Sequence, residues 1–135
     1  MIGNDFDSPH LECIFCQMLV KRDREILAEN GDFFAVEDQF PVNEHHSLII
    51  PKRHVLTLGH LREAEANSFF LILRQVQEHI RKTHSADGFN IGVNEGSAAG
   101  QTILHLHVHV IPRYVGDVKN PRGGVRNLKP ALVEY

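Results

Sequence analysis

Long apolar runs are missing from this chain, and so is any strong excess of charge of one sign. No stretch approaches the roughly 18 consecutive apolar residues that indicate a membrane-spanning helix. The opening residues, MIGNDFDSPHLE, have neither the basic region nor the apolar run of a signal peptide, so we expect a cytoplasmic protein. The formal net charge is only −3 at pH 7, which argues against binding to nucleic acid or a membrane by bulk electrostatics. The expected partner is a small molecule.

Cysteine is scarce as well. The two cysteines, Cys13 and Cys16, cannot form a disulfide framework, and a C-x-x-C pair in a reducing compartment is either a redox pair or half of a metal site. A redox pair of the thioredoxin type belongs at a helix start in a βαβ context, which the sequence does not predict here. The spacing lets both thiolates reach one tetrahedral zinc, and plain buried thiols are the third possibility. We favour zinc, which needs two further ligands.

The pattern of apolar residues predicts a single domain over residues 1–135, with no internal repeat. Residues 1–10 are expected to be loose, and residues 115–135, rich in glycine and proline, to form an irregular C-terminal tail. Strands are predicted at 33–40, 46–54 and 88–96, a long helix at 62–84, and a further strand at the histidine-rich segment after residue 104. The predicted fold is α+β, an antiparallel sheet of about five strands with one long helix packed on it.

The segment HLHVHV, residues 105–110, repeats histidine at every second position. Successive side chains of a strand point to opposite faces, so His105, His107 and His109 would form a row on one face. The β-branched valines between them favour a strand, and Pro112 either ends it or requires an edge position. The histidines are therefore expected to be presented together.

Three interpretations of this row remain open from the residues alone. It could be an ordinary solvated face, or a catalytic zinc site built from all three imidazoles. In the third, His107 is a covalent nucleophile, because a neutral imidazole is available near pH 7 and can attack phosphorus without a separate base. Gln101 and Thr102 just upstream, with His109 on the same face, would supply the hydrogen-bond donors that phosphoryl chemistry needs. We favour the nucleophile.

The stretch NEGSAAGQTILHLHVHVIPRY closely resembles the signature of the histidine triad (HIT) superfamily of nucleotide hydrolases and transferases. The resemblance extends upstream through VEDQFPVNEHHSLIIPKRH to CIFC, and covers roughly residues 11–115. It implies a HIT-like fold, a nucleotidyl-histidine mechanism on an AMP-containing substrate, and a homodimer in which two sheets join edge to edge. An exposed sheet edge that needs cover is a weak physical argument for the dimer.

The same resemblance implies roles for individual residues. His107 would attack the α-phosphorus, with His109 and Gln101 as further catalytic groups around the phosphate oxygens. Asn94 and Thr102 would hold the phosphate together with Gln101 and His109. Asp38 would accept hydrogen bonds from the ribose hydroxyls, although a turn-forming role is the alternative. The remaining positions, for which core packing is the alternative, would cradle the base: Phe15, Met18 and Val36.

For the cysteine pair, the resemblance implies a structural zinc held by Cys13, Cys16, His46 and His105. Such an ion would fix the strand beside the nucleophile without touching it. His54, at the other end of the second strand, is expected to be solvated or to cap a neighbouring element.

Branches of the superfamily differ in the leaving group. HVHVIPRYVGD looks more like the dinucleoside polyphosphate hydrolases than the phosphoramidases, so hydrolysis of a compound such as diadenosine tetraphosphate is the favoured function. An adenosine 5'-monophosphoramidase and a nucleotide-binding module with little turnover are the alternatives. The basic side chains of the tail could neutralise the distal phosphates of a leaving group or be ordinary solubilising charges: Lys119, Arg122, Arg126 and Lys129.

Overall fold

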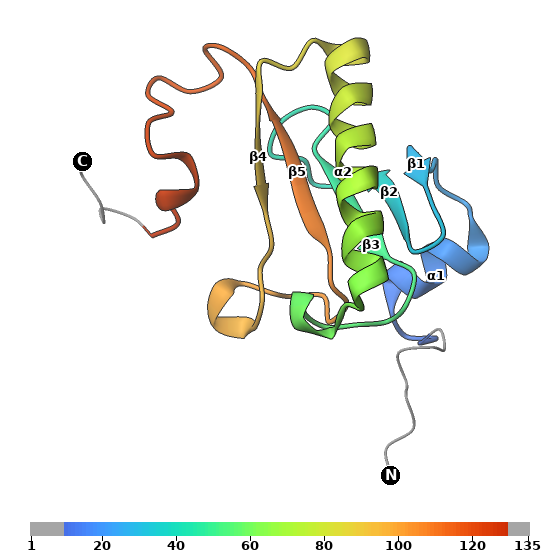
Figure 1. Ribbon diagram of the computed structural model, residues 1–135. Coiled ribbons are helices and arrows are strands. Elements are labelled where there is room, and N and C mark those ends of the chain that lie inside the picture. The colour runs from blue at the N-terminus through green and yellow to red at the C-terminus, as the bar shows by residue number, and fades with distance from the viewer. Residues whose placement is uncertain (1–9, 130–135) are drawn as a thin grey trace.

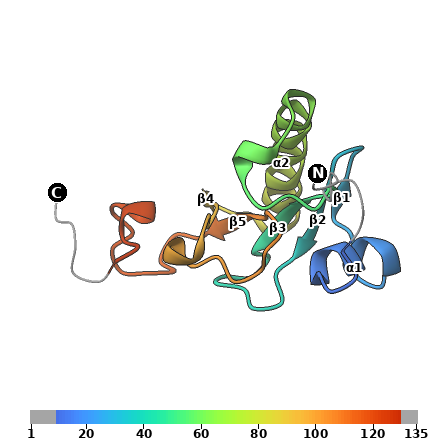
Figure 2. The same cartoon turned by 90° about the horizontal axis from the view of Figure 1, so that it is seen from below.

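The computed structural model describes residues 10–129 of the chain. One antiparallel sheet of five strands, in the order β1-β2-β3-β5-β4, carries a long helix on one face and a short helix beside the other (Figures 1 and 2). The α+β prediction is confirmed. The strands are β1 Ala28–Glu29, β2 Phe33–Glu37, β3 Ser47–Pro51, β4 Gly88–Gly92 and β5 Val108–Arg113. The α-helices are α1 Ile14–Lys21 and α2 Glu63–His84, and the 3-10 turns are η2 Leu58–His60, η3 Ser97–Ala99 and η4 Gly124–Arg126.

The first two predicted strands form an antiparallel hairpin of β2 and β3. Its register runs from Phe33 opposite Pro51 to Glu37 opposite Ser47. Both strands are buried on both faces, because one face packs on α2 and the other on α1. The connecting loop, residues 38–46, is closed by a hydrogen bond of 2.8 Å from the backbone N–H of Asp38 to the carbonyl of His46.

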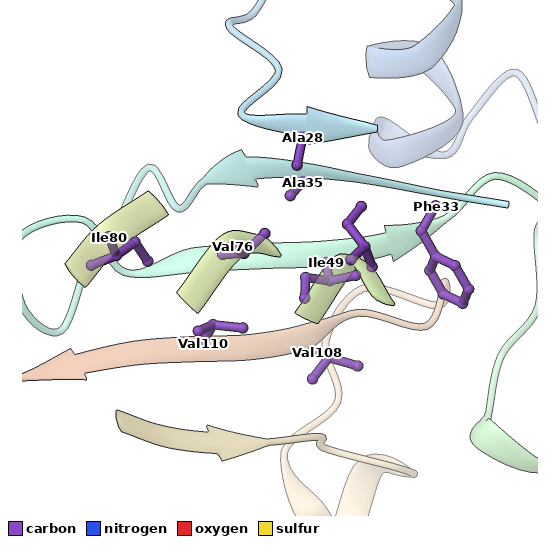
Figure 3. Packing of buried hydrophobic residues seen from close by; sticks show 9 residues of the cluster. Ala28, Phe33, Ala35, Ile49, Val76, Ile80, Val108 and Val110 are labelled. Carbon is purple, nitrogen blue, oxygen red and sulfur yellow. The ribbon is translucent and has the colours of Figure 1, made fainter. Parts of the chain in front are cut away.

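Helix α2 begins and ends almost where the sequence predicted. Glu65 Oε1 accepts the backbone N–H of Arg62 at 2.8 Å before the first turn, and Ser85 ends the helix in the left-handed region at φ 55°. Apolar side chains of α2 pack on the sheet (Figure 3). Ile72 is fully buried in this contact, whereas Phe70 is 61% exposed.

Helix α1 was not predicted. Cys13 is its N-cap, and Cys13 Sγ accepts the backbone N–H of Cys16 at 3.5 Å. The expectation that the cysteine pair does not begin a helix was therefore wrong, although no βαβ unit surrounds it in the described residues. Phe15 and Met18 pack against the face of β2 and β3 that α2 leaves open.

The histidine row has the predicted phase, but only part of it lies in a strand. β5 starts at Val108, and Val108 and Val110 join the core under α2 while His109 faces the other way. Pro112 lies inside β5 without breaking it. The pairing of β5 with β3 ends at Val110, so Pro112 occupies a local edge, as its missing N–H requires.

The C-terminal tail passes beyond β4 and includes η4 (Figure 1). Two ranges lie outside the described residues: 1–9 of the segment predicted to be loose, and 130–135 of the predicted tail. Between residues 10 and 129, none of the helices has the length and apolarity to cross a membrane.

Candidate functional site

The middle histidine of the row has a fixed tautomer. His107 Nδ1 lies 2.9 Å from the carbonyl oxygen of His105, which can only accept, so Nδ1 carries the proton and donates it. The lone pair is therefore on Nε2. The ring is 8% exposed and the Phe15 ring packs edge-on against it, with centroids 5.0 Å apart. A neutral imidazole held in this way has its nucleophilic nitrogen on the side away from the backbone.

The third histidine is oriented by a chain of hydrogen bonds that begins at the backbone. The N–H of Val42 donates to His46 Nδ1 at 3.0 Å, so neutral His46 carries its proton on Nε2. His46 Nε2 lies 2.9 Å from His109 Nδ1 and donates to it, which leaves the proton of His109 on Nε2. We call this series from Val42 through His46 to His109 the imidazole chain. It makes His109 Nε2 a hydrogen-bond donor.

Burial keeps both rings of the imidazole chain neutral. Burial lowers the pKa of His46 below its usual 6.5, partly offset by the nearby carboxylate of Asp38. Burial, with the neighbouring His107 and His46, lowers the pKa of His109 to about 4. Asp38 Oδ2 lies 3.4 Å from His46 Nε2 and 3.9 Å from His109 Nδ1. Neutral histidines donate and accept in the pattern just described.

A cavity of about 370 Å³, here called the first cavity, lies in front of these histidines. Its volume falls within the range of small-molecule sites. It brings together most of the residues that the sequence predicted for catalysis and substrate binding: His107, His109, Asp38, Asn94, Thr102, Phe15 and Met18. Arg24 and Phe40 also line it and were not predicted.

Two predicted substrate-binding residues do not line the first cavity. The Gln101 amide braces its own loop, because Oε1 accepts the N–H of Gly96 at 2.9 Å, and ties that loop to the segment after β3, because Nε2 donates to the carbonyl of Leu56 at 3.2 Å. Val36 is 1% exposed and packs beneath Phe15 in the core on the α1 side. Val36 therefore supports the cavity wall from behind.

The structure groups three of the predicted metal ligands, Cys13, Cys16 and His105, with His54 and places the fourth, His46, elsewhere. Ligand atoms of Cys13, Cys16, His54 and His105 all lie within 4.8 Å of one another, and we call these four residues the Cys–His cluster. His46 belongs to the imidazole chain instead. The physical reason is the path of the chain: β3 runs from Ser47 to Pro51, so His46 and His54 lie at opposite ends of the strand.

The Cys–His cluster has the dimensions of a tetrahedral metal site. A tetrahedral zinc with bonds of about 2.0–2.3 Å places its ligand atoms roughly 3.3–3.8 Å apart. His105 Nδ1 lies 3.3 Å from Cys13 Sγ, 3.6 Å from Cys16 Sγ and 3.2 Å from His54 Nδ1. His105 Nε2 donates to the carbonyl of Pro51 at 2.8 Å, so the lone pair of Nδ1 faces the two sulfurs. The donor set fits zinc.

Burial disfavours the thiolate form of Cys16 in the cluster. Burial, with a smaller contribution from the neighbouring Cys13, raises the pKa of the Cys16 thiol to about 11. A metal ion would compensate two adjacent thiolates in this buried position.

The three histidines of the row do not share one metal. His105 turns to the cysteines, His107 Nδ1 to a carbonyl, and His109 Nδ1 to His46. Asp38, His46 and His109 are also close enough together to hold an ion, but both ring nitrogens of His46 are already hydrogen-bonded. The arrangement favours a nucleophile with a separate structural metal over a catalytic three-histidine zinc.

Comparison with known proteins agrees with this geometry. The sequence profile of the HIT domain matches residues 20–116, which is more than half of the chain. The chain belongs to the HIT family. HIT proteins are nucleotide hydrolases and transferases, as the sequence resemblance indicated.

Relatives and solved structures extend the comparison. An uncharacterized HIT-like protein of Mycoplasma genitalium is 33% identical over 103 residues, 76% of this chain and 73% of that protein. A bis(5'-nucleosyl)-tetraphosphatase (asymmetrical) of Schizosaccharomyces pombe is 44% identical over 77 residues, 57% of this chain and 42% of that enzyme. The crystal structure of a Zn-bound histidine triad family protein from Mycobacterium smegmatis superposes with a TM-score of 0.69 at 33% identity, covering 78% of each chain. The predicted HIT fold is confirmed.

Proposed function

We propose that this protein hydrolyses AMP-containing nucleotides, with dinucleoside polyphosphates as substrates, through a covalent intermediate on His107. The single observation that carries the proposal is the hydrogen bond from His107 Nδ1 to the carbonyl of His105. It leaves the lone pair of Nε2 available at the wall of a cavity large enough for a nucleotide.

The reaction has two displacements at the α-phosphorus. The lone pair of His107 Nε2 forms a bond to phosphorus, and the bond to the bridging oxygen breaks, so that its electron pair leaves with the polyphosphate. Water then attacks the same phosphorus, loses a proton to solvent, and the nitrogen–phosphorus pair returns to Nε2 as AMP departs. His109 Nε2–H donates a hydrogen bond to the phosphate oxygens in both steps, a contact that strengthens as negative charge develops.

Other residues of the first cavity would position the nucleotide. Asp38 Oδ1 already accepts the backbone N–H of Phe40 at 2.8 Å, which holds the carboxylate in place for ribose hydroxyls. Asn94 and Thr102 offer an amide and a hydroxyl to the phosphate. Gln101 would act by fixing the loop that carries Thr102, since its amide bonds to Gly96 in that loop and to Leu56 in the segment after β3.

We also propose that the Cys–His cluster binds zinc in a structural role. The distances fit a tetrahedral ion, and the Mycobacterium smegmatis structure of the same family is described as zinc-bound. A bound ion would fix the ring of His105, whose carbonyl accepts the hydrogen bond from His107.

The choice of a dinucleoside polyphosphate is supported by the tetraphosphatase of Schizosaccharomyces pombe. The likeness to that enzyme covers 42% of its length, so it supports the chemistry of the shared region.

The experiment that tests the function traps the intermediate. The protein is mixed with diadenosine tetraphosphate, quenched in denaturant at alkaline pH because nitrogen–phosphorus bonds are acid-labile, and analysed by intact-mass spectrometry. We expect an adduct of one AMP on the wild type and none on His107→Ala. Adenosine 5'-phosphoramidate is run in parallel to test the alternative leaving group. Turnover of diadenosine tetraphosphate by His107→Ala at the wild-type rate would overturn the proposal.

A further inference from the structure

A second cavity, of about 380 Å³, lies next to the first one. His46, His109, Val42 and Asn94 line both cavities, so the imidazole chain forms the wall between them. His109, which donates to the phosphate in the proposed reaction, therefore also borders the second cavity.

The second cavity differs from the first in charge. Asp38 and Arg24 line the first cavity, whereas the described residues lining the second include no aspartate, glutamate, lysine or arginine. Its walls are apolar side chains, the amides of two asparagines and the two imidazoles of the chain. The pKa values of both imidazoles are lowered by burial, so they are neutral as well. A largely uncharged occupant with a few hydrogen-bonding groups fits these walls.

The C-terminal tail builds the outer wall of the second cavity. Val125 and Leu128 line it, and both are more than half exposed, so they offer apolar surface to an occupant. Gly124 seats the tail on β4: its φ is +47°, and a Cβ there would lie 3.2 Å from Asn90 Nδ2. Nearer its start the tail is fixed by Arg113, which forms a bidentate pair with Asp117.

The two cavities also match each other in size, at about 370 and 380 Å³. We propose that the second cavity binds the nucleoside of the leaving nucleotide, so that the preferred substrate carries a nucleoside at each end. This inference rests on the proposed function and assigns a binding place to the second nucleoside of that substrate. A cationic leaving group, such as lysine joined to AMP, would find no carboxylate among the described residues that line the second cavity.

The test compares two ligands that would both occupy the first cavity, only one of which is long enough to extend into the second. Calorimetry measures the affinity of AMP and of an uncleavable, methylene-bridged analogue of diadenosine tetraphosphate for the wild type and for the double variant Val125→Asn/Leu128→Asn. We expect about tenfold weaker binding of the analogue, because two apolar contacts are lost, and unchanged binding of AMP. Val118→Asn is the matched control, since Val118 is an exposed valine of the same tail that does not line the second cavity.

Turnover gives a second readout. The double variant should raise the KM for diadenosine tetraphosphate about tenfold and leave turnover of adenosine 5'-phosphoramidate unchanged, since its ammonia leaving group is too small to fill the second cavity. Equal losses for AMP and for the analogue, or undiminished affinity for the analogue, would overturn the inference. If the wild type turns over neither substrate, the proposed function fails, and the binding comparison still decides what the second cavity holds.

Discussion

Two clusters of imidazoles neighbour His107, one through His105 and the other through His109, and they use the same residue type in opposite ways. In the Cys–His cluster, Nδ1 of His54 and Nδ1 of His105 turn toward the cysteine sulfurs. In the imidazole chain, each ring nitrogen that faces a neighbour is part of a hydrogen bond that runs from the backbone toward His109. The partner of the second ring nitrogen therefore decides whether a histidine suits a metal or suits catalysis.

The largest expected effect is the loss of activity when His107, which lies between the two clusters, is replaced. We expect His107→Ala to lower kcat/KM for diadenosine tetraphosphate by on the order of 10⁴- to 10⁶-fold, as when a covalent nucleophile is removed. AMP release measured by chromatography checks this. His79→Ala, an exposed histidine on α2, is the control and should keep the wild-type rate. A His107→Ala enzyme within tenfold of the wild type would show that the imidazole is not the nucleophile.

The second-largest expected effect is loss of zinc, which should occur in variants of the Cys–His cluster but not in a variant of the imidazole chain. Cys16→Ser and His54→Ala should lose stoichiometric zinc, measured by elemental analysis, whereas His46→Asn should keep it. A ligand that binds only the folded state stabilises it by about 4 kcal/mol at roughly 1,000 times its Kd, so unfolding free energies should fall by about that amount. Zinc loss in His46→Asn with retention in His54→Ala would reverse the assignment of these two histidines.

The pH dependence of stability sharpens the comparison further. Burial lowers the pKa of His109 to about 4 from a usual 6.5, so the unfolded state binds more protons between these two values. The stability contributed by neutral His109 is complete above pH 6.5 and is lost as the pH falls to about 4. Urea unfolding should show the wild type losing about 3 kcal/mol more over this range than His109→Asn. The wild type and His109→Asn share the Cys–His cluster, so the titration of that cluster cancels in the difference between them. Parallel curves of unfolding free energy against pH would contradict the lowered pKa of His109.

The smallest expected effect concerns the hydrogen bond from His46 to His109. A net hydrogen bond contributes about 0.5–1.5 kcal/mol, so His46→Asn should lower kcat up to about tenfold with little change in KM. Adding His109→Asn should then cost less than the two single effects combined, because they share one interaction. His45→Asn is the control, since His45 has φ 69°, which asparagine tolerates, and bonds to Glu37 instead. Additive losses would show that His46 does not act through His109.

The sequence predicted the features that depend on local pattern. The spacing in HLHVHV predicted that His107 and His109 would face away from Val108, and the apolar repeat predicted the bounds of α2. Helix α1 was missed because its eight residues hold only one short apolar repeat, Phe15, Met18 and Leu19, and its start depends on the Cys13 side chain acting as a cap.

Features that depend on the path of the chain could not be predicted in the same way. Both His46 and His54 flank β3, and only the folded position of α1 decides which one meets the cysteines. The second cavity needs the tail to lie against β4, which a sequence rich in glycine and proline does not indicate. The homodimer remains a prediction, as do the roles of the individual site residues.

His105 joins the Cys–His cluster to the nucleophile within one residue, since its ring contacts the cysteines and its carbonyl fixes the ring of His107. A change at the cysteine sulfurs can reach the His107 ring without movement of a helix. A few covalent bonds of His105 and one hydrogen bond connect the two. In a batch of protein only partly loaded with zinc, the yield of product per milligram would then track the fraction of loaded molecules. Differences in specific activity between batches would then reflect differences in zinc content that arise during purification.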